Sequence, residues 1–209
     1  MKVTSTSFAD GKRIPEEFAF CAYDPQSHVK LSANRNPQLE WGDLPMGTRS
    51  IAVVCHDCDV PSLPDDVNVE GRTIWASLPR IDFFHWVLID LDPHSGPIGE
   101  GEFSDGVTAR GKPGPQAARN ARQGVNDYTL WFANNAEMSG DYFGYDGPCP
   151  PWNDSIVHHY VFTIYALDVA QLSVNGTFRG PDVLNAMKGH VLDEAKMTGL
   201  YSLNPAVSA

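Results

Sequence analysis

Long apolar segments are missing from this chain. No apolar run approaches the roughly 20 residues that a membrane-spanning helix needs. The first 18 residues, MKVTSTSFADGKRIPEEF, also lack the apolar core of a secretion signal. These two absences argue against a membrane-spanning helix and against export, so the sequence predicts a cytoplasmic protein.

Basic residues are scarce as well. The 209 residues include 15 Lys and Arg against 26 Asp and Glu, which gives a formal net charge of −11. Such a balance repels polyanions, so broad electrostatic capture of nucleic acid or of an anionic membrane surface is not expected. The nearest approach to a basic cluster, at 109–122, contains Pro and Gly and is typical of an exposed loop.

Cysteine is limited to four positions: Cys21, Cys55, Cys58 and Cys149. This number does not suggest a disulfide framework, so we expect free thiols. Cys55 and Cys58 form a CxxC pair, but no second ligand pair accompanies it as a zinc site requires. The surrounding residues are typical of a strand, whose alternation places positions three apart on opposite faces. We therefore expect structural cysteines, with no metal and no cofactor.

The rest of the composition is that of an ordinary globular protein, with 42% hydrophobic and 20% charged residues. One domain over residues 1–209 is expected. Short runs rich in β-branched and aromatic residues alternate with turn residues, and the runs at 50–57, 84–91 and 158–167 predict central strands. This spacing predicts a mainly β fold, with two antiparallel sheets packed as a Greek-key β-sandwich.

One stretch near the C-terminus has helical periodicity. Its apolar residues recur at steps of three or four: Leu184, Met187, Val191 and Ala195. The pattern predicts an amphipathic helix of about four turns within 181–197 that caps a sheet.

Polar side chains interrupt the apolar strands at informative places. Asp57 follows the first predicted strand, His85 opens the second, and the third begins with His158, His159 and Tyr160. Strand alternation places His158 and Tyr160 on one face and His159 on the other. These side chains could converge on one pocket, or each could satisfy a neighbouring loop, because burying a polar group requires a partner.

The order and spacing of several motifs resemble the phosphatidylethanolamine-binding protein family, in its Raf-kinase-inhibitor-like bacterial and archaeal branch. The motifs are HDCDVP, HWVLIDL, GPCPP and HHYVFTIYALD, and the resemblance covers nearly the whole chain. Cys58 stands where the family motif usually has a proline, and His159 stands where it usually has an arginine.

The resemblance implies a cavity that takes a small anion such as phosphate or acetate, or a phosphorylated head group like phosphoethanolamine. Carried over by position, its lining is Asp57, His85, Gly147, Pro148, His158 and Tyr160. Imidazole, phenol and backbone N–H groups are donors that suit an anion, and Asp57 would orient a histidine. The Gly- and Pro-rich turn at 147–151 would form a rigid wall beside His158.

A binding protein rather than an enzyme is therefore expected, with a kinase or another enzyme as a regulated partner. The alternative is a metal-dependent or acid/base hydrolase that uses Asp57, His85 and His158. A homodimer is also expected, from the family branch and from four aromatic residues that look exposed: Trp131, Phe132, Tyr142 and Phe143.

Overall fold

The computed structural model describes residues 1–207. Its short strands are β1 (Lys2–Thr4), β2 (Lys12–Arg13), β3 (Cys21–Asp24), β4 (His28–Leu31), β5 (Glu40–Gly42) and β8 (Arg122–Gln123). Its long strands are β6 (Ser50–Pro61), β7 (Arg80–Leu91), β9 (His158–Leu167) and β10 (Val191–Tyr201). The helices are α1 (Tyr128–Trp131) and α2 (Gly180–Ala186), with 3₁₀ turns at Glu16–Phe18 and Ala118–Asn120.

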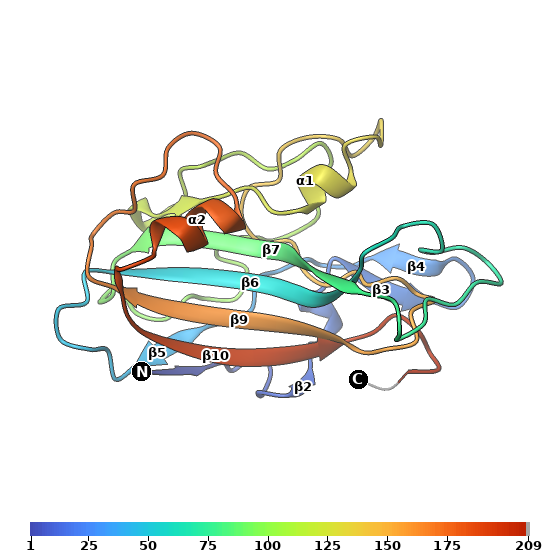
Figure 1. Ribbon diagram of the computed structural model, residues 1–209, viewed down its shortest axis with the longest axis horizontal. Coiled ribbons are helices and arrows are strands. Elements are labelled where there is room, and N and C mark those ends of the chain that lie inside the picture. Colours follow the sequence, from blue (N-terminus) through green and yellow to red (C-terminus); the bar gives the residue numbers. More distant parts are fainter. Residues whose placement is uncertain (208–209) are drawn as a thin grey trace.

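A six-stranded sheet in the order β2-β10-β9-β6-β7-β8 forms the centre of the fold, and its long strands run side by side in Figure 1. All its pairs are antiparallel except β2 with β10. Two further sheets, β1-β5 and β3-β4, have two strands each. The prediction of a mainly β fold is confirmed, and β6, β7 and β9 lie inside the central sheet as expected.

Both faces of the central sheet are buried, which explains the unbroken apolar runs of the sequence. Along β6, Ile51, Val53 and Cys55 belong to the larger core, whereas Ala52 and Val54 belong to the smaller core. The smaller core is closed by α2, which lies over β7 in Figure 1. Strand alternation therefore sends apolar side chains to both sides of the same strand.

The predicted helix within 181–197 is wrong over its second half. Helix α2 ends at Ala186, and the chain then turns through Gly189, whose φ of 84° is in the left-handed region. Val191–Tyr201 is strand β10, which pairs along its length with β9. No helix in residues 1–207 is long and apolar enough to span a membrane.

The period of two in β10 was hidden by its exposed first residues. Met197, Gly199 and Tyr201 are buried at alternate positions, but Val191 and Leu192 are 40% and 42% exposed. A short segment whose apolar residues recur at steps of two and also at steps of three or four is compatible with a strand and with a helix. Here the pairing with β9 makes it a strand. Gly199 is required in this strand because a Cβ would lie 2.3 Å from the Ile14 side chain.

The expectation of four free thiols is wrong for two of them. Cys21 and Cys149 form a disulfide across 128 residues of sequence, with their Cα atoms 4.9 Å apart, whereas Cys55 and Cys58 are free. Only the fold brings the two bonded residues together, so sequence spacing could not reveal the pair. The cytoplasmic location stays a prediction, and this disulfide counts against it because disulfides persist mainly in oxidising compartments.

Candidate functional site

A cavity of about 760 Å³ opens at the end of the central sheet where β6 ends and β9 begins. Residues of β3, β4, β7 and α1 line it, together with the turn at 149–151. Four of the predicted site residues are among those that line it: Asp57, His85, His158 and Tyr160. They meet because β7, β6 and β9 are neighbours in the sheet.

His158 lies between two carboxylates at the base of this cavity. Its Nδ1 is 2.7 Å from Asp57 Oδ2 and its Nε2 is 3.1 Å from Asp154 Oδ2, and all three side chains are at most 2% exposed. Burial alone would lower the pKa of His158, but the two carboxylates outweigh it and raise the pKa to about 9. The imidazole is therefore charged at neutral pH and donates both of its N–H groups to carboxylates.

Arg80 completes the charge balance of this cluster. Its Nη1 and Nη2 donate to Asp154 Oδ2 and Oδ1 at 2.5 and 3.1 Å. Burial raises the pKa of Asp57 and of Asp154, but His158 lowers both by more than this. Arg80 lowers the pKa of Asp154 further, so both pKa values lie below the usual range. Two positive and two negative groups then sum to zero, and His158 has no N–H left for a ligand. His158 therefore links strand β9 to Asp57 in β6 and to Asp154 in the loop before β9.

His85 differs from His158 in its charge and in having a ring nitrogen that is free to form a hydrogen bond. Its Nδ1 donates to the backbone carbonyl of Asp146 at 2.7 Å, and no hydrogen bond to Nε2 forms within residues 1–207. Burial lowers the pKa of His85, with Asp57 acting in the opposite direction, so the ring is neutral at pH 7. A neutral ring that donates from Nδ1 keeps a lone pair on Nε2, so His85 offers an acceptor.

The carbonyl that orients His85 is itself firmly held. The Asp146 carboxylate accepts from Asn34 Nδ2 and Asn126 Nδ2, each at 2.7 Å, and lies 3.0 Å from Lys112 Nζ. Asp146 is fully buried, and a rigid buried network of this kind fixes the geometry of what it contacts. The tautomer and the orientation of His85 are thus set by groups outside the cavity.

Tyr160 contributes the one buried hydroxyl of the cavity that has no hydrogen-bond partner within residues 1–207. The residue is 1% exposed, and its ring lies 5.1 Å from that of His85, edge to face. Burial raises the pKa of Tyr160 far above its usual value, and Asp57 adds to this, so the hydroxyl keeps its proton. Buried polar groups nearly always have partners, so this hydroxyl indicates a place where water or a ligand binds.

Gly147 and Pro148 do not line the cavity, although the resemblance assigned them to it. The Gly147 N–H donates to Asn34 Oδ1 at 2.8 Å, and the Pro148 carbonyl accepts from Phe20 and Cys21. Gly147 is required for packing, since a Cβ there would lie 2.1 Å from the Phe18 carbonyl oxygen. The wall of the cavity is instead formed by the next three residues, at 149–151.

His159 faces away from the cavity, as strand alternation predicts. Its side chain is 50% exposed and its Nδ1 lies 2.8 Å from Asp59 Oδ2. Asp154 and Arg80, by contrast, were missed. Asp154 lies four residues before His158 in a loop, where no periodicity indicates the direction of a side chain, and Arg80 comes from another strand.

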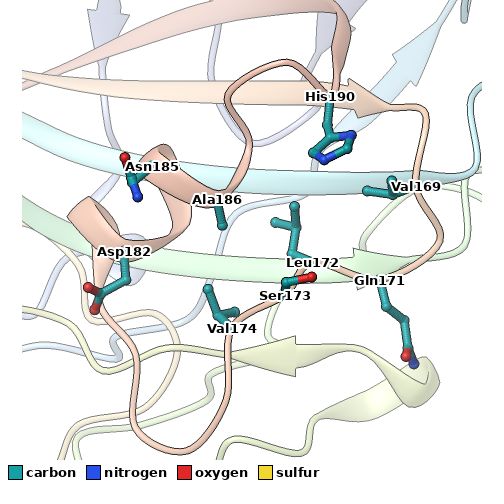
Figure 2. Close-up of a pocket in the computed structure, with 9 residues that line it drawn as sticks. All are labelled: Val169, Gln171, Leu172, Ser173, Val174, Asp182, Asn185, Ala186 and His190. Atoms are coloured by element: carbon teal, nitrogen blue, oxygen red, sulfur yellow. The ribbon is translucent and has the colours of Figure 1, made fainter.

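A second cavity, of about 340 Å³, lies beside α2 and is shown in Figure 2. Leu172 and Val174 form part of its apolar surface, and Asp182, Asn185 and His190 bring polar groups to it. His190 Nδ1 lies 2.8 Å from Asp168 Oδ1. None of the residues that line this cavity has a buried polar atom without a partner. This distinction favours the first cavity as the functional one.

Within residues 1–207, no cluster of three or more His, Cys, Asp or Glu side chains has the arrangement of a metal site. The hydrolase alternative stays a prediction of the sequence.

Comparisons with known proteins agree with the fold and the motifs. A UPF0098 protein of Methanothermobacter thermautotrophicus is 33% identical over 204 residues, which cover 96% of this chain and 98% of the relative. The UPF0098 protein YbhB of Escherichia coli is 28% identical over 97% of this chain and 100% of its own. A crystal structure of a phosphatidylethanolamine-binding protein homologue from Chlamydia trachomatis superposes with a TM-score of 0.64 at 26% identity, covering 96% of both chains. The model of the phosphatidylethanolamine-binding protein family matches residues 4–202, and the chain belongs to this family.

Proposed function

We propose that this chain is a binding protein that takes the polar head of a small ligand between His85 and Tyr160. The observation that carries the proposal is the buried Tyr160 hydroxyl, which lacks a partner within residues 1–207 and lies beside a histidine with a free Nε2. Both groups are held by the sheet and by buried hydrogen bonds, so a ligand binds without a large ordering cost. The expected phosphate, acetate or phosphorylated head group fits this site on one condition.

The condition is that His85 takes up a proton with the anion. The cluster of Asp57, Asp154, His158 and Arg80 has no net charge, and the free atom of neutral His85 is an acceptor. An anion meets a donor at Nε2 only when His85 is protonated. Anion binding therefore raises the pKa of His85, and by linkage the affinity increases as the pH falls.

The hydrolase alternative receives less support from the same hydrogen bonds. Acyl or phosphoryl transfer needs donors aimed at the charge that develops on oxygen. Both N–H groups of His158 are used by carboxylates, and the Gly147 N–H is used by Asn34. His85 could act as a base, but the floor of the cavity would supply one hydroxyl donor, that of Tyr160.

Sulfate is the cleanest probe of this site because it keeps its charge over the range in which histidine titrates. We expect sulfate to bind at least about tenfold more tightly at pH 5.5 than at pH 8, since one-proton linkage changes affinity up to about tenfold per pH unit. Calorimetry in two buffers of different ionisation enthalpy should detect the uptake of about one proton at intermediate pH.

Three variants separate the roles of the site residues in this experiment. His85→Gln should abolish the pH dependence, because glutamine does not titrate, and Tyr160→Phe should weaken sulfate binding at both pH values. His159→Ala is the matched control and should bind like the unmodified protein, since its side chain is exposed on the opposite strand face. Equal affinities of the unmodified protein at pH 5.5 and pH 8 would refute proton-coupled anion binding.

Regulation of a kinase or of another enzyme through this site is proposed from the family resemblance alone. A pull-down from the source lysate, with and without sulfate, tests it. Recovery of a kinase in only one of the two conditions would support regulation, and recovery of none in either condition would speak against it.

Self-association as a homodimer stays a prediction, but fewer of the four aromatic residues are exposed than the sequence analysis expected. Tyr142 and Phe143 are 0% and 8% exposed, and Phe132 packs against the larger core, so Trp131, at 49%, is the exposed one of the four aromatics. A dimer should give twice the monomer mass in light scattering. A mass near 22.9 kDa at micromolar concentration would contradict it.

A further inference from the structure

One peptide group next to the cavity links the ring of His85 to a side chain outside it. The carbonyl of Asp146 accepts from His85 Nδ1 at 2.7 Å, and the N–H of Asp146 donates to the His85 carbonyl at 3.0 Å. The N–H at the other end of the Asp146–Gly147 peptide group donates to Asn34 Oδ1 at 2.8 Å. Rotation of this peptide group would break the bond to Asn34 and the bond to the His85 ring together.

Asn34 binds the same segment a second time. Its Nδ2 donates to the Asp146 carboxylate at 2.7 Å and to the Gly106 carbonyl at 3.1 Å, so both amide N–H groups are used. Asn34 is fully buried and does not line the cavity. Its φ of 52° is in the left-handed region, which asparagine adopts more readily than most residues. Asn34 can therefore affect a ligand only through the groups that it holds.

The remaining carbonyls of residues 144–147 are held in the same way. This segment belongs to no helix or strand, so no sheet pairing fixes it. Three further side chains donate to its carbonyls at 144, 145 and 147: Asn126, Lys112 and Tyr128. A buried network whose members are all paired is rigid. The carbonyl of Asp146 is thus fixed, and the ring of His85 has to match it.

A carbonyl can only accept, and this decides which nitrogen of neutral His85 carries the proton. Nδ1 keeps its N–H for the Asp146 carbonyl, and Nε2 keeps its lone pair. An imidazole without such a partner can carry its proton on either nitrogen. With the proton on Nε2, His85 would offer a donor to an anion without taking up a further proton. The fixed carbonyl excludes this form.

The groups around His85 keep the ring neutral until a proton is added. Burial lowers the pKa of His85, and three carboxylates act against it: Asp57 in β6, Asp127 before α1, and Asp146. The rings of Tyr128 and Tyr160 face His85 edge to face at 5.6 and 5.1 Å. Burial raises the pKa of both tyrosines far above the usual value, so they stay neutral.

We propose that Asn34 is the positioning residue of this site. By holding the Asp146–Gly147 peptide group, it keeps His85 in the tautomer with the proton on Nδ1 and so makes anion binding depend on the uptake of a proton. This inference rests on the proposed function and specifies how pH regulates it.

The tautomer of His85 can be measured without a ligand. At pH 8, long-range ¹H–¹⁵N correlation spectra distinguish protonated from unprotonated ring nitrogens, and comparison with His85→Gln identifies His85 among the seven histidines. We expect the proton on Nδ1 in the unmodified protein. A proton on Nε2 would overturn the inference, whatever the variants show.

Asn34→Gly removes the side chain without opposing the backbone, because glycine adopts a φ of 52° readily. We expect a mixture of the two tautomers. Sulfate affinity at pH 8 should rise about fivefold, the contribution of one added hydrogen bond, whereas affinity at pH 5.5 should not rise, because an imidazolium donates from both nitrogens in either protein. The ratio of the two affinities should therefore fall from at least about tenfold to about twofold.

Asn36→Ala is the matched control. Asn36 is fully buried in the same loop, and its side chain bonds the Phe103 and Ser104 N–H groups and the Gly99 carbonyl, with no hydrogen bond to residues 144–147. This variant loses buried hydrogen bonds as Asn34→Gly does, but it should keep the proton on Nδ1 and the full pH ratio. An equal fall of the ratio in both variants would show a general loss of structure and overturn the inference.

Lys112→Met is a second variant, for use if Asn34→Gly does not fold. Lys112 donates to the Tyr145 carbonyl and lies 3.0 Å from Asp146 Oδ1, and its side chain is 12% exposed, so water can reach the groups that it leaves. It should change the tautomer and the pH ratio in the same direction. An unchanged tautomer and an unchanged ratio would overturn the inference.

The outcomes separate this inference from the proposed function. Sulfate binding with the expected pH dependence, together with an unchanged tautomer and ratio in Asn34→Gly, would overturn the inference alone. No sulfate binding to the unmodified protein at pH 5.5 would overturn the proposed function. The tautomers of the unmodified protein and of Asn34→Gly would then still decide whether Asn34 positions His85.

Discussion

Replacing His158 with alanine should lower the free energy of unfolding by about 3–5 kcal/mol at pH 7. The substitution leaves Asp57 and Asp154 buried without the imidazolium that lies 2.7 and 3.1 Å from them. Removing one partner of a buried ion pair costs this much because the remaining charge is uncompensated. Urea denaturation followed by circular dichroism measures the change.

His159→Ala is the matched control for this prediction. His159 forms the same kind of contact with Asp59, at 2.8 Å, but its side chain is 50% exposed. Exposed ion pairs contribute about 0–1 kcal/mol, so this variant should lose little stability. A loss as large as that of His158→Ala would show that burial of the carboxylates does not determine the effect.

The pH dependence of stability gives a second measure of the same cluster. The pKa of His158 is raised in the folded state from 6.5 to about 9, which corresponds to about 3 kcal/mol. Because the folded value is the higher one, this contribution is complete below pH 6.5 and is lost as the pH rises through 9. The lowered pKa values of Asp57 and Asp154 act in the opposite direction, and their contribution is lost in acid.

The unmodified protein should therefore lose stability between pH 6.5 and pH 9.5, and His158→Ala should lack this loss. Denaturation curves at four or more pH values test it. Parallel pH profiles for the two proteins would contradict the assignment of a charged His158.

Removal of the Cys21–Cys149 disulfide is the other change with a large expected effect. Cys149→Ser should lower the free energy of unfolding by about 2–5 kcal/mol. The bond closes a loop of 128 residues, and for loops of this size the chain-entropy model gives about 5 kcal/mol. Denaturation with and without a dithiol reductant measures the effect, since reduction of the unmodified protein should reproduce the variant.

Cys58→Ser provides the control, because Cys58 is exposed and free. It should unfold like the unmodified protein. Sulfate binding to Cys149→Ser is a useful companion measurement, since both bonded cysteines line the cavity. Unchanged denaturation midpoints for Cys149→Ser would mean that Cys21 and Cys149 are not joined in solution.

The central strands could be predicted because their residues carry the information locally. β6, β7 and β9 have β-branched and aromatic side chains on both faces, and a sheet covered on both sides requires this composition. Asp57, His85, His158 and Tyr160 could be assigned to one pocket because each lies near the point where an apolar run of the sequence begins or ends. The family motifs added the same residues independently of periodicity.

The sequence by itself thus determined the three central strands β6, β7 and β9, the mainly β fold class, the family and the four side chains that meet in the cavity. Only the tertiary structure decided that 191–201 is a strand, that Cys21 meets Cys149, and that Asp154 and Arg80 neutralise the cluster around His158. It also decided which histidine is charged, because two buried carboxylates outweigh the effect of burial on the pKa of His158, whereas burial dominates for His85. Periodicity reports which face of a strand a residue occupies. The partner of a buried group, and hence its charge, comes from segments far away in the sequence, so it depends on the folded arrangement.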